Sequence, residues 1–279
     1  MLGKLVGLGL EENNITGCIS ITIFNISSLQ VLSPGRNSLI GYLPGEVGNL
    51  TKLQNLQLEE NMLTGEIPKD VSNLIELVKI HLSFNKFIGS LPMEIFNISG
   101  VRDIALVGNN LSRTLPLNIG SMLPDIEELY LGNMNLFGSI PHSLSNCSKL
   151  TNLDLSGNKL TSLIPNSLGY LTHLKYLLLG RNYLMSDTTL SFLNSLSNCR
   201  DLELLDLSSN HLNGMLPVSL GNLSSTSLAL FEAADCKIKG EFPKGIGNLS
   251  SLIDLDLSGN GLIGSIPSII SNLRFLQSF

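Results

Sequence analysis

Charged residues are scarce in this sequence: they make up 14% of its 279 residues, against about 25% in an average soluble protein. Tryptophan is absent, and aromatic residues account for only 5%. The 17 lysines and arginines are outnumbered by 23 acidic residues, for a net charge of −6, so a nucleic-acid partner is not expected. No apolar run approaches the ~18 residues that span a bilayer, and the N-terminus lacks the apolar segment and cleavage site of a signal peptide. We therefore expect no membrane contact by this segment itself.

Residues that commonly build metal and catalytic sites are few and scattered. The four cysteines, at positions 18, 147, 199 and 236, form no Cys-x-x-Cys pair and no cluster with histidine, which argues against zinc and against a redox pair. The four histidines share no metal-ligand spacing, and no Gly-x-Ser-x-Gly segment is present. We therefore expect no metal, no cofactor and no catalysis in this chain, and we expect the cysteines to be mostly buried free thiols.

What the sequence has instead is an internal repeat of the form Leu-x-x-Leu-x-Leu-x-x-Asn. Its last position recurs, mostly at steps of 24 residues, at 13, 37, 61, 85, 109, 134, 158, 182, 210, 236 and 260. Met134 and Cys236 interrupt a column that is otherwise asparagine: Asn13, Asn37, Asn61, Asn85, Asn109, Asn158, Asn182, Asn210 and Asn260. Glycine usually follows this position by four residues, proline by seven and a second asparagine by twelve. Units in register over the whole chain predict a solenoid made of one kind of coil.

The repeat has a direct physical interpretation. Alternation of leucine with polar residues predicts a half-buried strand in each unit. The asparagine side chain has donors and an acceptor, so a column of asparagines can satisfy the backbone groups of the turn that leaves each strand. Glycine permits the next turn, and proline stiffens the outer segment where no ladder bond is made.

The 24-residue unit LxxLxLxxNxLxGxIPxxLGNL resembles the plant-specific class of leucine-rich repeats. The resemblance covers essentially the whole chain. It implies an α/β solenoid, a right-handed superhelix of about 11 repeats with a parallel β-sheet on its concave face. It also predicts a single leucine-rich-repeat array over residues 1–279.

One unit, around residues 183–199, is irregular because its step lengthens to 28 residues and it lacks the glycine and proline of its neighbours. Leu190, Leu193 and Leu196 fall on one helical face there, and Asp187 or Thr188 is a plausible cap. The segment therefore predicts a short helix on the outer side of the solenoid.

This insertion and the segments LGNLSSTSL and IKGEFPKGIGNLSSL narrow the resemblance to plant receptor kinases of the pattern-recognition group. That group includes the flagellin and elongation-factor receptors and the rice Xanthomonas-resistance receptor. The resemblance implies a segment at the extracellular face of the plasma membrane, or in the apoplast, that binds a peptide or protein ligand. It also implies a co-receptor kinase that has leucine-rich repeats of its own.

Other features of such receptors are missing from this sequence. It has no kinase signature, no transmembrane segment and none of the paired cysteines that usually cap these arrays. We therefore expect a fragment, a truncated gene product or a degenerate relative, with any kinase activity residing elsewhere.

Eight Asn-x-Ser/Thr sequons favour a glycosylated extracellular surface. They begin at Asn14, Asn25, Asn49, Asn97, Asn110, Asn146, Asn222 and Asn248. Six of them coincide with the second asparagine column of the repeat, so the alternative is that the repeat supplies these asparagines for structural reasons and buries some of them.

The residues between the leucines of each strand vary along the array, as a recognition surface requires. Because aromatic residues and arginine dominate binding hot spots, we expect ligand contacts at His81, Arg102, Glu128, Tyr130, Asp154, Tyr176 and Arg181. The alternative is that these are solvated strand positions, and Asp154 in particular belongs to a recurring Leu-Asp-Leu-Ser phrase that has a structural explanation.

Two functions compete at this point. The first is a protein- or peptide-binding segment of a plant cell-surface receptor, in immune perception. The second is a soluble secreted repeat protein that inhibits a pathogen wall-degrading enzyme. A third alternative is a non-functional gene fragment, for which we expect aggregation unless capping units cover the open leucine columns.

Overall fold

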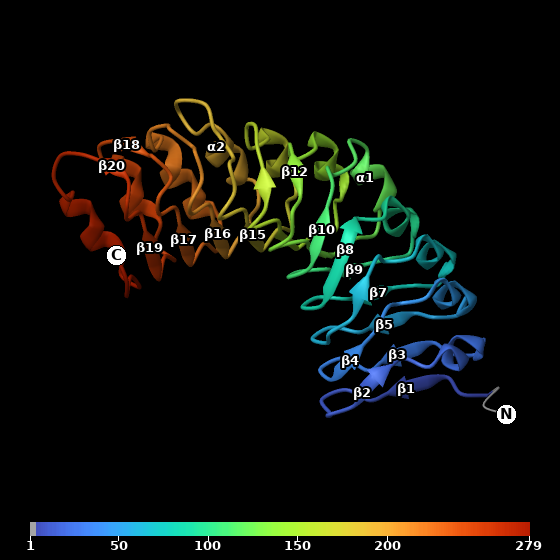
Figure 1. The fold of residues 1–279 in the computed structure, drawn as a ribbon. Helices are drawn as coiled ribbons and strands as arrows, with labels where there is room; N and C mark the ends of the chain where they lie inside the picture. Colours follow the sequence, from blue (N-terminus) through green and yellow to red (C-terminus); the bar gives the residue numbers. More distant parts are fainter. Residues whose placement is uncertain (1–3) are drawn as a thin grey trace. The chain divides into compact units, whose positions relative to one another are not determined.

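The computed structural model describes residues 4–279 and contains two compact units, Met1–Leu136 and Phe137–Phe279. Each unit is a stack of short coils, one for each sequence repeat, and each coil follows its predecessor with a strand on one side and a short helix on the other (Figure 1). The predicted repeat solenoid is confirmed in both units. None of the helices within residues 4–279 is long and apolar enough to cross a membrane.

The first strand of each coil pairs in parallel with the equivalent strand of the next coil. In unit 1 these strands are β1 (Gly7–Gly9), β3 (Val31–Ser33), β5 (Asn55–Gln57), β7 (Lys79–His81), β9 (Asp103–Ala105) and β11 (Glu128–Tyr130). In unit 2 they are β13 (Asn152–Asp154), β15 (Tyr176–Leu178), β16 (Leu204–Asp206), β17 (Leu230–Glu232) and β19 (Asp254–Asp256). The register aligns equivalent repeat positions, so that Leu56 pairs with Ile80 and Ile80 with Ile104.

Shorter strands follow in most coils and form small parallel sheets of their own. Unit 1 has β2 (Thr16–Cys18), β4 (Ser38–Ile40), β6 (Thr64–Gly65), β8 (Lys86–Ser90) and β10 (Asn110–Ser112). Unit 2 has β12 (Phe137–Gly138), β14 (Lys159–Leu160), β18 (Lys239–Gly240) and β20 (Gly261–Leu262). The repeat glycine belongs to this segment, and seven of the eight adopt φ between 80° and 90°, a conformation that side chains with a Cβ avoid.

Each coil closes with a short helix. In unit 1 these are η1 (Ile21–Asn25), η2 (Gly45–Asn49), η3 (Lys69–Asn73), η4 (Met93–Asn97) and α1 (Ile119–Met122). In unit 2 they are η5 (His142–Asn146), η6 (Asn166–Tyr170), α2 (Phe192–Leu196), η7 (Val218–Ser225), η8 (Lys244–Asn248) and η9 (Ser268–Asn272). The repeat proline is the N-cap of eight of these helices, with φ between −67° and −79°, close to the value that its ring imposes.

The leucine columns point inward and form the core. The middle residues of the strands, such as Leu56, Ile80 and Ile104 in unit 1 and Leu177 in unit 2, are fully buried. Strand residues on either side of them point outward, because side chains alternate along a strand. The outward residues of the first strands therefore form one surface in each unit, which we call the strand face.

The repeat asparagine bonds the backbone across coils, as Asn85 illustrates. Its Nδ2 donates to the carbonyls of Leu58 at 2.9 Å, Leu82 at 3.2 Å and Ser83 at 3.3 Å, while its Oδ1 accepts from the Leu63 N–H at 3.0 Å. The interior members of the column are buried: Asn61, Asn85, Asn109, Asn158, Asn182 and Asn210. Asn37 and Asn260 are partly exposed, and Asn13 is exposed.

The two exceptions in the column are also buried, and cysteine substitutes for asparagine in part. The Cys236 thiol donates to the Leu207 carbonyl at 3.0 Å, which is equivalent to one bond of the asparagine amide. Met134 is 5% exposed and brings no donor to that position.

The helix expected in the irregular unit is present but begins later. Helix α2 starts at Phe192, because Leu190 has φ 45° and cannot be helical. Asp187 does bond the turn before the helix: its Oδ1 accepts from the N–H groups of Thr189 and Ser191, both at 3.0 Å. Leu190, Leu193 and Leu196 are all buried, so the apolar face was identified correctly although its first residue is not helical.

The cysteines agree with the expectation that most of them are buried free thiols. Cys147, Cys199 and Cys236 are buried free thiols, but Cys18 is exposed. Burial raises the pKa of the thiols of Cys147 and Cys236 to about 11 and that of Cys199 to about 12. Cys18 is the last residue of the short strand β2 and is exposed.

Candidate functional site

The strand face of unit 1 contains a compact charged cluster on β7 and β9. One carboxylate oxygen of Asp103, Oδ2, lies 2.9 Å from Lys79 Nζ and 2.8 Å from His81 Nε2. Asp103 is 8% exposed, whereas Lys79 and His81 are partly exposed. The second oxygen, Oδ1, is buried without a partner among the described residues.

Electrostatics stabilise the ionised form of this carboxylate. Burial raises the pKa of Asp103, but hydrogen bonds and opposite charges from His81 and Lys79 outweigh it, and the pKa ends below its usual range. Oδ1 itself is buried, so the groups that this cluster presents to a ligand are the partly exposed side chains of Lys79 and His81. His81, expected from the sequence, thus belongs to a cluster with two residues that were not selected.

The remaining expected residues of unit 1 lie beside this cluster. Glu128 aligns with Asp103 on the neighbouring strand, and Tyr130 aligns with Ala105. The Tyr130 hydroxyl donates to Glu128 Oε2 at 2.9 Å. Arg102, just before β9, is exposed and lies 3.5 Å from Glu127 Oε1. The structure therefore brings His81, Glu128 and Tyr130 onto one surface, and Arg102 lies directly before the strand β9 of that surface.

The expected residues of unit 2 differ in their exposure. Asp154 is 8% exposed, and its Oδ1 accepts from the Ser156 N–H at 2.9 Å and hydroxyl at 2.7 Å. Burial raises its pKa, although the bonds to Ser156 act in the opposite direction. This geometry favours the structural explanation of the Leu-Asp-Leu-Ser phrase, so Asp154 is poorly placed for ligand contact.

Tyr176 is exposed on β15, and its hydroxyl donates to Glu203 Oε2 at 3.2 Å. The negative charge of Glu203 and this hydrogen bond raise the pKa of Tyr176. Arg181 lies beyond the end of β15, is exposed and has φ 55°. Unit 2 therefore presents an aromatic and a cationic side chain on the same coil.

Arg181 belongs to a column of residues that share this conformation. Each residue directly before a repeat asparagine, or before Met134 or Cys236, has positive φ: Glu12, Arg36, Glu60, Phe84, Gly108, Asn133, Gly157, Arg181, Ser209, Asp235 and Gly259. Most are not glycine, although the left-handed conformation costs roughly 1–2 kcal/mol for other residues. Arg36 uses the position to pair with Glu12 at 2.5 Å and Glu60 at 3.2 Å, and Phe84, 57% exposed, covers Gly108.

The strand face of unit 2 becomes acidic toward β19. Asp206, Glu232 and Asp256 align on consecutive strands. Burial, followed by repulsion from Asp206, Asp254 and Asp256, raises the pKa of Glu232. Within residues 4–279 no group of three or more His, Cys, Asp or Glu residues could hold a metal ion.

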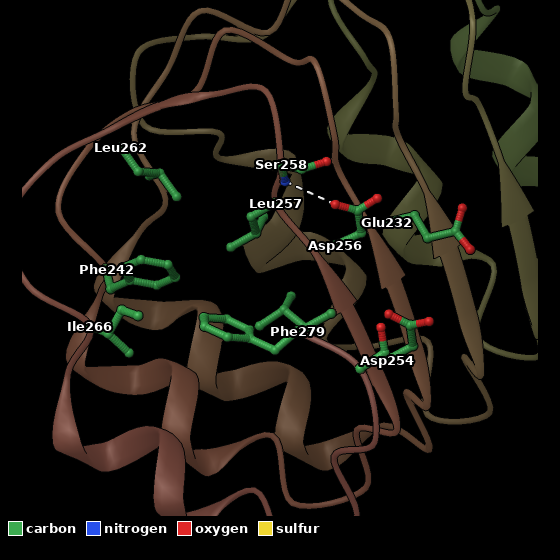
Figure 2. Close-up of a pocket in the computed structure, with 11 residues that line it drawn as sticks. Glu232, Phe242, Asp254, Asp256, Leu257, Ser258, Leu262, Ile266 and Phe279 are labelled. Carbon is green, nitrogen blue, oxygen red and sulfur yellow. Dashed lines mark hydrogen bonds between the residues drawn. The ribbon is translucent and has the colours of Figure 1, made fainter.

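A hollow of about 720 Å³ lies beside β19, and Figure 2 shows apolar side chains on one side of it and carboxylates on the other. Phe242, Ile266 and Phe279 line its apolar side. Ile266 is 68% exposed, whereas its repeat equivalents Ile140 and Ile164 are buried. A following coil covers Ile140 and Ile164, and this difference accounts for the exposure of Ile266, so we do not assign a ligand to the hollow.

The sequon asparagines occupy exposed positions. All eight are exposed to solvent, which removes the alternative that the second asparagine column buries some of them. In unit 2 the column has Tyr170 in place of an asparagine, and Asn198, which is one of its asparagines, lies outside a sequon. A hollow of about 800 Å³ lies between these two coils, lined by Tyr170, His173, Asn198, Arg200 and Asp201 among others.

The fold and these repeats can now be compared with known proteins. A leucine-rich-repeat family model matches residues 124–184, and a second one matches 52–74, 201–223 and 251–273. A leucine-rich-repeat protein of Leptospira interrogans is 31% identical in sequence, with a TM-score of 0.73 over 99% of this chain and 72% of that one. The chain belongs to the leucine-rich-repeat proteins.

Plant receptors are also similar to this chain. The receptor-like kinase EFR of Arabidopsis thaliana is 42% identical over 79 residues, which cover 28% of this chain and 7% of that receptor. The rice receptor kinase-like protein Xa21 is 41% identical over 91 residues, which cover 32% of this chain and 9% of Xa21. The structure of the plant peptide hormone receptor RGFR1 with RGF2 matches 99% of this chain and 47% of RGFR1, at 33% identity and a TM-score of 0.87.

Three charged residues of the strand faces were not selected from the sequence: Lys79, Asp103 and Glu203. Lys79 and Asp103 have opposite charges at the same repeat position, 24 residues apart. Because the register aligns such positions, opposite charges at this spacing could have indicated the pair. Glu203 lies one residue outside its strand, where the repeat pattern does not specify a direction for the side chain.

Proposed function

We propose that this chain is a peptide- or protein-binding segment of a plant cell-surface receptor, acting in immune perception, with no catalytic activity of its own. The observation that carries the proposal is the strand face of unit 1, where the partly exposed side chains of Lys79, His81 and Tyr130 lie around the buried carboxylate of Asp103. Similarity to RGFR1, a receptor whose structure contains a bound peptide, supports it.

The partners follow from the same similarity. The receptor kinase HAESA, whose structure contains a peptide hormone and the co-receptor SERK1, is 25% identical with a TM-score of 0.75 and covers 99% of this chain. We propose a peptide ligand on the strand face and a leucine-rich-repeat co-receptor kinase as the second partner. Arg102, Tyr176 and Arg181 are exposed, and we propose that they contact the peptide ligand. We also propose that the two units form one leucine-rich-repeat array.

A displayed library of random peptides, selected on the wild-type chain, tests the binding surface. Tyr130→Ala and Tyr176→Ala are expected to weaken selected peptides by about tenfold or more, because aromatic anchors dominate such interfaces. Tyr42→Ala is the matched control, since Tyr42 is 68% exposed and follows β4, away from the strand face. Selected peptides that tolerate both strand-face variants would contradict the proposed site.

We further propose that the segment is extracellular and glycosylated, supported by the exposure of all eight sequon asparagines. Secreted from a eukaryotic host, the chain is expected to lose mass when treated with peptide N-glycosidase. Tyr170→Asn converts the segment Tyr170-Leu171-Thr172 into a sequon at an exposed column position and is expected to add one glycan. Tyr170→Gln, which makes no sequon, is the control. No mass change in the wild-type chain would refute the extracellular assignment.

A further inference from the structure

Two Asn-Gly dipeptides occur in the chain, Asn213–Gly214 and Asn260–Gly261. In this dipeptide the glycine nitrogen can attack the side-chain amide of the asparagine before it, because glycine has no Cβ to shield the nitrogen. Both dipeptides lie in unit 2, but the fold holds them differently.

The Asn260 amide is engaged on both sides. Its Nδ2 donates to the carbonyls of Ala233 at 2.8 Å, Leu257 at 2.9 Å and Ser258 at 3.2 Å, and its Oδ1 accepts from the N–H groups of Cys236 at 3.1 Å and Ile238 at 2.9 Å. The attacking group is engaged too, because the Gly261 N–H donates to the Ile238 carbonyl at 2.7 Å. Attack therefore requires several hydrogen bonds to break together.

Asn213 is held far more weakly. It is exposed and has φ 55°. Among the described residues its side chain makes one hydrogen bond, from Nδ2 to the His211 carbonyl at 2.8 Å, and its backbone N–H donates to the Cys236 carbonyl at 3.3 Å. In the described part of the chain the Gly214 N–H has no hydrogen-bond partner. Only glycine fits at position 214, because a Cβ there would lie 2.5 Å from Leu190 Cδ1 and 2.8 Å from the Asp187 carbonyl. The packing of the irregular coil therefore requires the glycine of this dipeptide.

We propose that Asn213 is a site of spontaneous deamidation and that the hydrogen bonds of the repeat asparagine column protect Asn260 from the same reaction. The Gly214 nitrogen forms a bond to Cγ of Asn213, the Cγ–Nδ2 bond breaks, and ammonia leaves with the proton that the Gly214 nitrogen gives up. Water then opens the cyclic imide at either carbonyl and yields aspartate or isoaspartate. The net change is one amide hydrolysed to a carboxylate, with no oxidant or reductant.

The reaction would alter the coil that follows the irregular unit. Either product adds a negative charge at an exposed position. Isoaspartate also lengthens the main chain by one carbon just before the parallel bridge between Met215 and Lys239. The strand face lies on the other strand of the coil, so this proposal does not depend on the proposed function.

The experiment incubates the intact chain at mildly alkaline pH and follows both dipeptides by mass spectrometry of proteolytic fragments. In the native chain, deamidation at Asn213 is expected to be at least about ten times faster than at Asn260, because the ladder bonds must open first. In concentrated denaturant the two rates are expected to converge, which separates the effect of the fold from that of the dipeptide.

Asn213→Gln is the matched variant and is expected to remove the acidic species that accumulates on ion exchange. Equal rates at the two dipeptides in the native chain, or an unmodified Asn213 after the unfolded chain has reacted, would overturn the proposal.

Discussion

Asn85→Ala is expected to destabilise unit 1 by about 3–5 kcal/mol, because it leaves several buried backbone groups without partners, each costing roughly 1–3 kcal/mol. The Leu63 N–H loses its acceptor, and the carbonyls of Leu58, Leu82 and Ser83 lose a shared donor. Asn85 is buried, at 8% exposed, so these groups lie away from the surface. The measurement is the denaturant midpoint, together with hydrogen exchange at the Leu63 amide.

Asn73→Ala is the matched control for this variant. Asn73 belongs to the second asparagine column of the repeat, lies exposed at the end of η3 and is outside any sequon. Its replacement is therefore expected to lower the free energy of unfolding by less than about 0.5 kcal/mol. Asn85→Cys is expected to recover part of the loss, because a cysteine in this column donates to a carbonyl at position 236. Equal destabilisation by the variants at 85 and 73 would contradict the role of the ladder.

Cys18 is expected to react with a thiol reagent at least about a hundred times faster than the other three cysteines in the native chain. Its side chain is exposed, whereas Cys147, Cys199 and Cys236 are buried. With pKa values of about 11, 12 and 11, at most about one in a thousand of these buried thiols is ionised at pH 8. Timed alkylation followed by mass spectrometry measures the difference.

Cys18→Ser is expected to abolish the fast labelling, and denaturant is expected to expose all four thiols. Rapid labelling of several cysteines in the native chain would show that the leucine columns open readily.

The raised pKa values of the buried thiols also predict that the free energy of unfolding changes with pH. Because the unfolded thiols ionise near pH 8.5, below their folded values, the stability they contribute is full below that pH and declines as the pH rises above it.

Much of the fold could be predicted from the spacing of a few residue types. Leucine periodicity identified the strands and the core, and proline and glycine marked the helix starts and the turns, because each acts through its own backbone conformation. The role of the repeat asparagine could also be predicted, since its side chain has both donors and an acceptor within reach of a turn. These are local properties that repeat in every coil.

The candidate site was predicted less completely. Periodicity located His81, Glu128 and Tyr130 on the strand face. Asp103, which pairs with both Lys79 and His81, was not selected, and neither was Lys79. Asp154 was selected although it is buried and its Oδ1 accepts two hydrogen bonds from Ser156. Which charges pair, and which carboxylate folds back onto its own turn, depends on rotamers and contacts between coils.

The sequence by itself determined the kind of coil, the number of coils and their register, because leucine, asparagine, glycine and proline recur at the same positions of most repeats. Tertiary structure alone decided what the coils expose. It placed Cys18 in solvent and the other cysteines in the core, and it exposed every sequon asparagine. It also gave the Asn260 side chain bonds to several backbone groups, whereas the Asn213 side chain bonds the His211 carbonyl. Exposure depends on what the next coil covers, and a repeating pattern assigns the same residue type to covered and uncovered positions alike.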